Sequence, residues 1–319
     1  MSDAVTLSVC IITYNHAKFI RQALDSVLMQ KVDFPWEIII ADDCSTDGTR
    51  EIIIEYQKQH PQLIRLILQE KNVGPALNWL ELISTPSAKY IAYLEGDDYW
   101  IDSLKLQKQI SFLELNPDCA FCYTNAFVMR DDNPNPTELF LTSPAPSIHS
   151  FNLILKRGKV APSCTIIYRR SAAPNPWPQW LKDIFHGDLA FHGLIGLKGS
   201  FGYLDMATGV YRVHVSSRIN SSKNEIAKSE NFLKLMDHLN EASGRKYSRE
   251  INFHRADHLE FLALENLKEK NWGNFLRLIF KSIRYEPIRG IPELRRGFYR
   301  FRKALVNPKL SSQISYAKK

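Results

Sequence analysis

The chain has 319 residues, enough for one large α/β domain and a smaller appendage. Its hydrophobic share of 45% and charged share of 24% are ordinary for a globular protein, and no apolar run approaches the roughly 20 residues of a membrane-spanning helix. Residues 1–6 lack the features of a signal peptide and the five cysteines lack disulfide-framework spacing, so we expect a cytoplasmic protein.

The first 115 residues alternate between strand-like and helix-like segments. Short apolar runs predict buried strands over residues 7–12, 37–41, 63–68 and 90–94. Apolar residues at helical spacing predict helices over residues 20–28, near 52–56, over 73–82 and over 103–115. Because right-handed crossovers connect such units, we expect an α/β fold with a mostly parallel central sheet flanked by helices.

Three polar clusters stand at the carboxyl ends of these strands. They are Thr13-Tyr14-Asn15, Asp42-Asp43 and Glu95-Gly96-Asp97-Asp98. Ligands bind at this edge of parallel sheets, so the three clusters predict one shared site. Neither a G-x-G-x-x-G fingerprint nor a P-loop follows the first strand, which argues against a dinucleotide site of the usual kind.

The acidic cluster at 95–98 indicates metal chemistry. Three carboxylates on one turn repel one another, so a contribution to folding stability does not explain their presence. A divalent cation with a phosphate behind it would explain the arrangement. The sequence therefore predicts an enzyme that handles a phosphorylated substrate through Mg2+ or Mn2+.

The regular alternation ends after residue 130. Residues 131–147 are rich in proline and predict a surface loop. Beyond it we expect a helix over 189–197, strands within 203–215, and helices from residue 229 onward. We expect a catalytic domain over residues 1–220 and a helical, basic C-terminal region over residues 221–319.

The net charge of +7 has its source in the C-terminal segment. Residues 281–319 hold 11 Lys/Arg against 2 Asp/Glu, which leaves the rest of the chain close to neutral. Aromatic and cationic residues mix there, which suits an anionic membrane surface; a merely solvated surface is the alternative. No nucleic-acid module accompanies the charge, so we expect no nucleic-acid partner, and we expect peripheral attachment to the inner face of the plasma membrane.

These pieces, in this order, resemble the family 2 glycosyltransferases, which have the GT-A (Rossmann-like) fold. Residues 8–15 resemble the opening strand and nucleotide-binding turn of that family, and residues 42–49 resemble its D-D-x-S-x-D-x-T signature. Residues 95–98 stand where the D-x-D metal motif belongs, with Glu in its first position. Gly187-Asp188 resembles the acceptor-side base, and residues 211–214 resemble the Y-R-x-H ending of many members.

The resemblance implies a metal-dependent, inverting transfer of a sugar from a nucleotide-diphosphate sugar to a saccharide or lipid-linked acceptor. Residues 99–107 are similar to a bacterial subgroup, which implies a role in cell-surface polysaccharide biosynthesis. Asp188 is implied as the general base, and Asp98 and His214 as metal ligands. Trp100 and His186 are implied on the acceptor side. Contacts with the nucleotide sugar are implied for Ile12, Thr13, Tyr14, Asn15, Asp43, Asn72, Asn78, Glu95 and Asp97.

Several of these assignments have a structural alternative. Asp188 could cap the helix that follows it, Trp100 could be an ordinary core tryptophan, and a plain helix entry would explain Asn72 and Asn78. For the whole chain, the alternatives are a nucleotidyltransferase acting on sugar phosphates and a non-catalytic sugar-nucleotide-binding module. The first of these would normally show a glycine-rich, basic loop after the first strand, where this chain has Thr13-Tyr14-Asn15.

Overall fold

The computed structural model describes residues 4–130, 135–143, 147–157, 161–213 and 225–286. The chain forms two compact units, Met1–Lys223 and Asn224–Lys319. Over the ranges just given, no helix combines the length and the apolar character needed to cross a bilayer.

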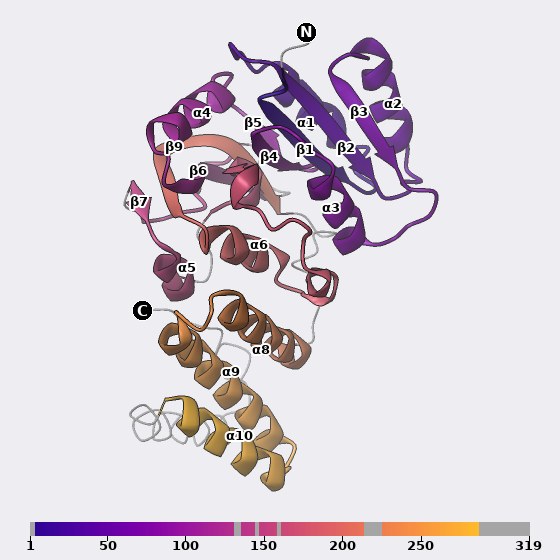
Figure 1. The fold of residues 1–319 in the computed structure, drawn as a ribbon. Helices are drawn as coiled ribbons and strands as arrows, with labels where there is room; N and C mark the ends of the chain where they lie inside the picture. Colours follow the sequence, from indigo (N-terminus) through magenta and orange to yellow (C-terminus); the bar gives the residue numbers. More distant parts are fainter. Residues whose placement is uncertain (1–3, 131–134, 144–146, 158–160, 214–224, 287–319) are drawn as a thin grey trace. The chain divides into compact units, whose positions relative to one another are not determined.

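Four parallel strands form one half of the sheet in the first unit (Figure 1), in the order β3-β2-β1-β4. Their bounds are β1 (Leu7–Thr13), β2 (Trp36–Asp42), β3 (Ile64–Leu68) and β4 (Tyr90–Glu95). Nearly every residue of β1 is buried, as expected for a central parallel strand that is covered on both faces. The predicted parallel sheet is therefore confirmed.

Helices connect and cover these strands. They are α1 (Ile20–Leu28), α2 (Thr49–Gln59), α3 (Pro75–Ser84) and α4 (Lys105–Leu115). The buried residues of α1 include Ile20, Ala23, Leu24 and Val27, a spacing that places them on one helical face. Together with the apolar residues of β1, β2 and β4 they belong to the main core.

The second half of the sheet mixes strand directions. The full order among the described residues is β3-β2-β1-β4-β8-β6-β9-β5, with β7 paired to β9. Strands β6 and β9 run in the same direction as β1 to β4, whereas β5, β7 and β8 run opposite to them. The bounds are β5 (Tyr99–Trp100), β6 (Cys119–Arg130), β7 (Ile148–His149), β8 (Ile167–Arg169) and β9 (Ser200–Val213). Two helices, α5 (Phe151–Arg157) and α6 (Gly187–Gly196), complete this half.

Three helices make up the described part of the second unit: α8 (Glu225–Ala242), α9 (Ser248–Lys268) and α10 (Trp272–Tyr285). Helix α9 packs against both of the others. Ala263 and Leu267 of α9 and Phe275 of α10 form a small separate core. The expected helical C-terminal extension is present over residues 225–285.

Candidate active site

The register of the sheet brings the three polar clusters to one edge. Thr13 stands beside Asp42 in the β1–β2 pair, and Ile12 stands beside Glu95 in the β1–β4 pair. The backbone amide of Gly96 then donates to the Ile12 carbonyl at 2.8 Å, which continues the β1–β4 pairing past the strand. The turns that follow β1, β2 and β4 therefore lie next to one another.

Hydrogen bonds tie the turn after β1 to the turn after β2. The Asn15 amide donates to Ser45 Oγ, and Asn15 Oδ1 accepts from the Thr46 amide, both at 2.9 Å. Asn15 (φ 54°) and Cys44 (φ 60°) both have left-handed backbone conformations. For a residue such as Cys44 this costs roughly 1–2 kcal/mol, and strain of this kind is concentrated at functional turns. The Tyr14 ring is 43% exposed at the same edge.

Asp42 is fully buried and has a structural role. Arg50 Nε donates to Asp42 Oδ2 at 2.6 Å, and the Ser45 hydroxyl donates to Asp42 Oδ1. The same guanidinium donates to the Gln69 carbonyl at 2.7 Å, so it also ties α2 to the end of β3. Both oxygens of Asp42 therefore have partners within the protein.

Asp43 holds the loop that opens α3. Its Oδ1 accepts from the Val73 amide at 2.7 Å and its Oδ2 from the Gly74 amide at 3.0 Å, while the Asn72 side chain donates to the Asp43 carbonyl at 3.3 Å. Burial raises the pKa of Asp43, and the two backbone hydrogen bonds oppose that rise. Asp43 and Asn72 thus lie at the predicted edge, and Asp43 has an anchoring role that the sequence did not indicate.

Two residues predicted to contact ligands are buried and hydrogen-bonded within the protein. Asn78 has no exposed surface, donates to the Ala41 carbonyl at 3.2 Å and holds α3 on β2. Trp100 is 1% exposed, its Nε1 donates to the Cys164 carbonyl at 2.7 Å, and Lys105 Nζ lies 4.4 Å from the centre of its ring. Trp100 therefore packs in the core, which is the structural alternative considered for it above.

The acidic turn packs directly against the turn after β1. The Asp98 amide donates to the Glu95 carbonyl at 3.1 Å, which closes the turn. Gly96 leaves no room for a side chain, because an added Cβ would lie 2.8 Å from Thr13 Oγ1 and 2.9 Å from His16 Nδ1. The close approach of these two turns thus depends on glycine at position 96.

Two carboxylate oxygens of this turn are buried without a hydrogen-bond partner among the described residues. Asp98 Oδ1 accepts from the Arg212 amide at 2.8 Å, but Asp98 Oδ2 and Glu95 Oε2 accept from no described residue. Burial and the charge of Asp97 raise the pKa of Asp98. Burial and the charges of Asp98, Asp188 and Asp97 raise the pKa of Glu95. The described residues therefore leave one oxygen of Asp98 and one of Glu95 open to a ligand.

Arg212 links β9 to the acidic turn. Its guanidinium carbon lies 4.6 Å from the centre of the Tyr99 ring and 5.0 Å from that of Phe19, and the side chain donates to the carbonyl of Asp97 and to Gln22 Oε1. The sequence marked Arg212 only as part of the terminal motif, whereas the structure shows that it supports the turn. The predicted metal ligand His214 lies outside the described residues.

Asp188 acts electrostatically on the same groups. It lies in the first turn of α6, whose N-cap residue is His186. Burial and then the charges of nearby carboxylates, Asp188 among them, raise the pKa values of Tyr93, Glu95 and Tyr211. Because its charge affects residues of both β4 and β9, Asp188 lies in the neighbourhood of the acidic turn.

Two residues near this turn were not predicted from the sequence. The buried side chains of Ser163 and Cys164 lie near Glu95 and Asp98, respectively, and oppose the rise in the pKa of each carboxyl. Both belong to a short 3-10 helix, Ser163–Thr165, just before β8. No motif marks this segment in the sequence, and it reaches the turn only because β8 pairs with β4.

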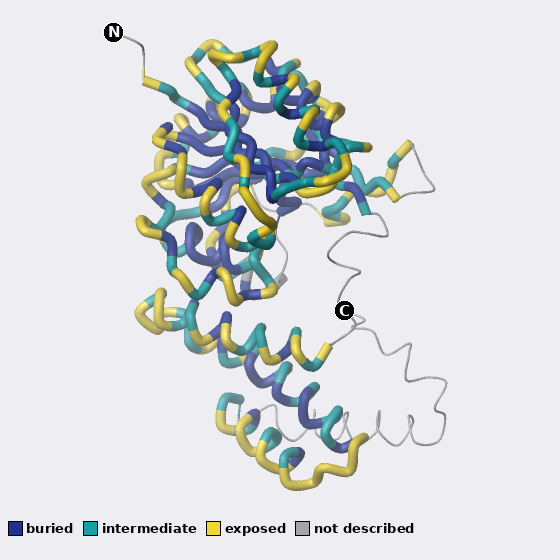
Figure 2. Tube along the Cα trace, turned by 90° about the vertical axis from the view of Figure 1, so that its right-hand side faces the viewer, coloured by how far each residue is buried: buried dark blue, intermediate teal, exposed yellow. Residues whose placement is uncertain are grey.

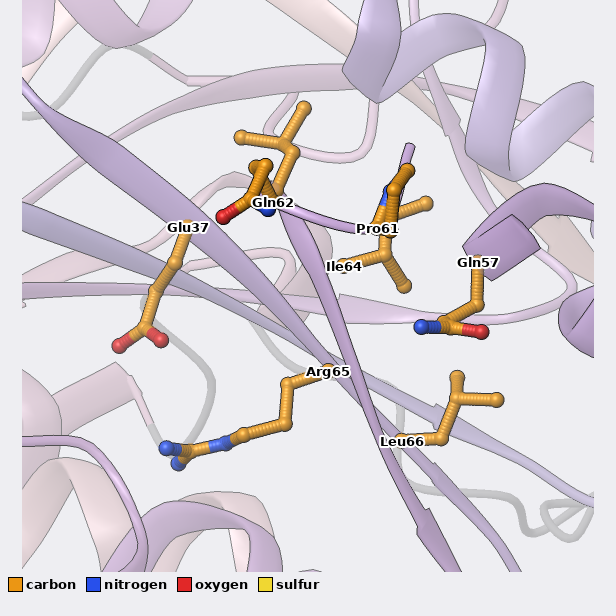
Figure 3. A pocket seen from close by; sticks show the side chains of 8 residues that line it. Glu37, Gln57, Pro61, Gln62, Ile64, Arg65 and Leu66 are labelled. Carbon is orange, nitrogen blue, oxygen red and sulfur yellow. The ribbon is translucent and has the colours of Figure 1, made fainter. Parts of the chain in front are cut away.

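No three histidine, cysteine or acidic side chains, counted over the described part of the chain, are grouped as a complete metal site. A surface hollow of about 510 Å³ lies elsewhere, at the amino-terminal ends of β2 and β3 (Figure 3). Glu37, Gln57 and Arg65 are among its lining residues, and none of the predicted site residues lines it. This hollow is separate from the polar edge.

Comparison with known sequences gives a family match. The model of the family described as Glycosyl transferase family 2 matches residues 8–175. The chain is 35% identical over 208 residues to the uncharacterized protein Rv1520 of Mycobacterium tuberculosis. The aligned residues cover 65% of this chain and 59% of Rv1520.

Two other relatives have names that state a glycosyltransferase. TuaG of Bacillus subtilis, named for teichuronic acid biosynthesis, is 36% identical over 138 residues (43% of this chain, 53% of TuaG). WfgD of Escherichia coli, named as a UDP-Glc:alpha-D-GlcNAc-diphosphoundecaprenol beta-1,3-glucosyltransferase, is 28% identical over 176 residues (55% of this chain, 65% of WfgD).

Solved structures share the fold. The S. aureus TarS fragment 1-349 in complex with UDP matches with a TM-score of 0.63 at 20% identity, covering 98% of this chain and 93% of TarS 1-349. The mannosyltransferase PcManGT of Pyrobaculum calidifontis, in complex with GDP-Man and Mn2+, matches with a TM-score of 0.54 at 14% identity, covering 96% of this chain and 82% of that one. With the family match spanning more than half of its length, this chain belongs to glycosyltransferase family 2 and has the GT-A fold.

Proposed function

We propose that this chain is a metal-dependent, inverting glycosyltransferase that moves a hexosyl or related sugar from a nucleotide-diphosphate sugar to a saccharide or lipid-linked acceptor. One observation carries the proposal: Asp98 Oδ2 and Glu95 Oε2 are buried at the edge where β1, β2 and β4 end, with no hydrogen-bond partner among the described residues. Buried carboxylate oxygens of this kind are costly unless a cation or a donor reaches them.

The residues present fit Mg2+ or Mn2+. Carboxylate oxygens are the hard ligands that these ions prefer, and Mg2+ commonly takes one or two carboxylates from the protein and further ligands from substrate phosphates and water. Asp98 would hold the ion, with His214 as a second ligand or phosphate contact and with Glu95 and Asp97 as secondary contacts. When bound, the ion neutralises charge on the leaving diphosphate. The Mn2+ in the PcManGT complex supports this choice.

The turns after β1 and β2 are proposed to bind the nucleotide. Ile12, Thr13 and Asn15 would face it, the exposed Tyr14 ring would contact the base, and Asp43 would accept from a base N–H. Each Asp43 oxygen keeps a second lone pair beyond the one that its backbone donor uses. Asn72, which hydrogen-bonds to Asp43, would approach the ribose or the donor sugar. The UDP bound in TarS makes UDP the first nucleotide to test.

Asp188 is proposed as the general base. It would take the proton of the acceptor hydroxyl as that oxygen bonds to the anomeric carbon. The bond from that carbon to the diphosphate oxygen breaks, and the diphosphate leaves with the electron pair. A single displacement of this kind inverts the anomeric configuration. His186, next to the first turn of α6, would lie on the acceptor side.

The proposed setting is cell-surface polysaccharide biosynthesis. The names of TuaG and WfgD support it, and the WfgD name includes a lipid-linked acceptor. We assign catalysis to residues 1–220 and place the enzyme in the cytoplasm, attached peripherally to the inner face of the plasma membrane through the basic region that follows.

Thermal unfolding with UDP, GDP or dTDP, each with and without Mn2+, tests the site, because a ligand of the folded state raises apparent stability. We expect a rise that requires both nucleotide and metal, and we expect Asp98→Asn to abolish it. Asp188→Asn should keep the rise and lower transfer by about 10²- to 10⁴-fold. Asp33→Asn, an exposed site, is the matched control. Transfer that survives Asp188→Asn would reject the assigned base, and a rise that survives Asp98→Asn would reject the metal site.

A further inference from the structure

Helix α10 carries an apolar stripe that the other described helices of its unit, α8 and α9, do not cover. Trp272, Leu276 and Phe280 are 59%, 50% and 69% exposed. Residues four positions apart lie on one side of a helix, so these three form a continuous stripe. Figure 2 shows exposed residues recurring along this helix.

The stripe is distinct from the face that α10 uses for packing. Phe275 is 6% exposed and meets Ala263 and Leu267 of α9, with Leu278 and Ile279 packed beside it. The apolar arc of α10 is therefore wider than its contact with α9 requires. A helix that only had to pack against α9 would have polar residues at positions 272, 276 and 280.

Positive charge borders the stripe. Arg277, Lys281 and Arg284 are exposed, and residues 272–285 contain no Asp or Glu. A second copy of this helix would bring like charges together, which disfavours self-association through the stripe. An anionic surface that also offers an apolar layer satisfies both features. A helix of 14 residues is too short to span a bilayer, which takes about 20 residues, so it would lie in the plane of the interface.

We infer that the α10 stripe binds the interface of an anionic phospholipid bilayer, with Trp272, Leu276 and Phe280 in the acyl boundary and the three basic residues at the headgroups. This deepens the membrane attachment in the proposed function by assigning it to a described helix, and it does not depend on sugar transfer. Charge alone would give attraction without insertion of apolar side chains.

Sedimentation of the full chain with vesicles tests the inference, using phosphatidylcholine with and without phosphatidylglycerol. We expect binding that requires the anionic lipid, and we expect Leu276→Ser with Phe280→Ser to lower the partition coefficient at least tenfold without changing charge. Leu115→Ser removes another exposed leucine, 83% exposed on α4, and should bind like the wild type. Binding unchanged in the double variant overturns the inference and assigns any attachment to charge elsewhere.

Fluorescence locates the helix in the bilayer. Brominated acyl chains should quench part of the tryptophan emission, and Trp272→Phe should remove that part. Absence of any quenching that depends on Trp272 overturns the inference. So does a double variant that dissociates an oligomer while vesicle binding stays the same, because the stripe would then bind a second copy. The UDP and Mn2+ stability shift should persist in all of these variants, so a failure here is distinct from a failure of the proposed transferase.

Discussion

Replacing Gly96 with alanine tests whether the close packing of two turns sets the geometry of the site. The added Cβ would lie 2.8 Å from Thr13 Oγ1 and 3.0 Å from Thr13 Cβ, whereas ordinary contacts begin at 3.4 Å. Relief requires the acidic turn and the β1 turn to separate by up to about 0.6 Å, from 2.8 to 3.4 Å. Overpacking of this kind costs roughly 1–3 kcal/mol.

We expect Gly96→Ala to affect the rate of sugar transfer more strongly than the free energy of unfolding. A misplacement of about 1 Å at a reacting centre lowers the rate roughly 100-fold, so we expect Gly96→Ala to lower transfer at least about tenfold. Urea unfolding measures the stability change. Nucleoside diphosphate release from a panel of sugar nucleotides with Mn2+ measures turnover.

Gly209→Ala is the matched control, because its Cβ would lie 3.4 Å from the Tyr99 carbonyl, an ordinary contact in the same sheet. It should keep stability within about 1 kcal/mol and turnover within about twofold of the wild type. If Gly96→Ala behaved like this control, the two turns would not be in the contact described here, and the reasoning about their geometry would fail.

Two further substitutions probe buried charge. Arg50→Ala leaves the fully buried Asp42 carboxylate without its cation and should destabilise the fold by about 3 kcal/mol. Arg21→Ala breaks a solvent-exposed pair with Glu55 and should leave the urea midpoint close to that of the wild type. Equal urea midpoints for the two variants would contradict this. Burial lowers the pKa of Lys105 to about 7, against about 10.4 in an unfolded chain. Between these values the unfolded chain holds a proton that the folded chain lacks, so stability should rise by about 2 kcal/mol from pH 7.5 to 9.5. We expect Lys105→Met to reduce this rise when the free energy of unfolding is measured with urea at several pH values. An unchanged dependence on pH would assign the rise to another titratable group.

Prediction from the sequence was most accurate where an apolar pattern identified a strand and polar residues followed at its carboxyl end. Four buried runs gave β1 to β4, and the polar residues just after three of them meet at one edge because parallel strands in register end together. The opposite half of the sheet was harder to foresee. Strands β5 and β7 have two residues each and β8 has three, which is too short for an alternating pattern to appear.

Individual contacts were predicted less well than positions. Trp100 follows the acidic turn in the sequence, yet it points into the core, because its Nε1 has a buried acceptor in the Cys164 carbonyl. Ser163 reaches Glu95 from a segment about 70 residues away. Neither fact follows from local pattern, since both depend on how β8 pairs with β4 in the folded protein.

Four of the five acidic residues in the polar clusters divide into two kinds, and this division is the strongest argument for a bound ligand. Both oxygens of Asp42 accept hydrogen bonds, from Arg50 and Ser45, and both oxygens of Asp43 accept from backbone amides. Asp98 has one oxygen fixed by a backbone donor, and its second oxygen, like Glu95 Oε2, is buried without a described partner. The protein thus satisfies the carboxylates that hold its turns together. It orients Asp98 through one atom and leaves the other open, which is the arrangement that a group from outside the chain requires.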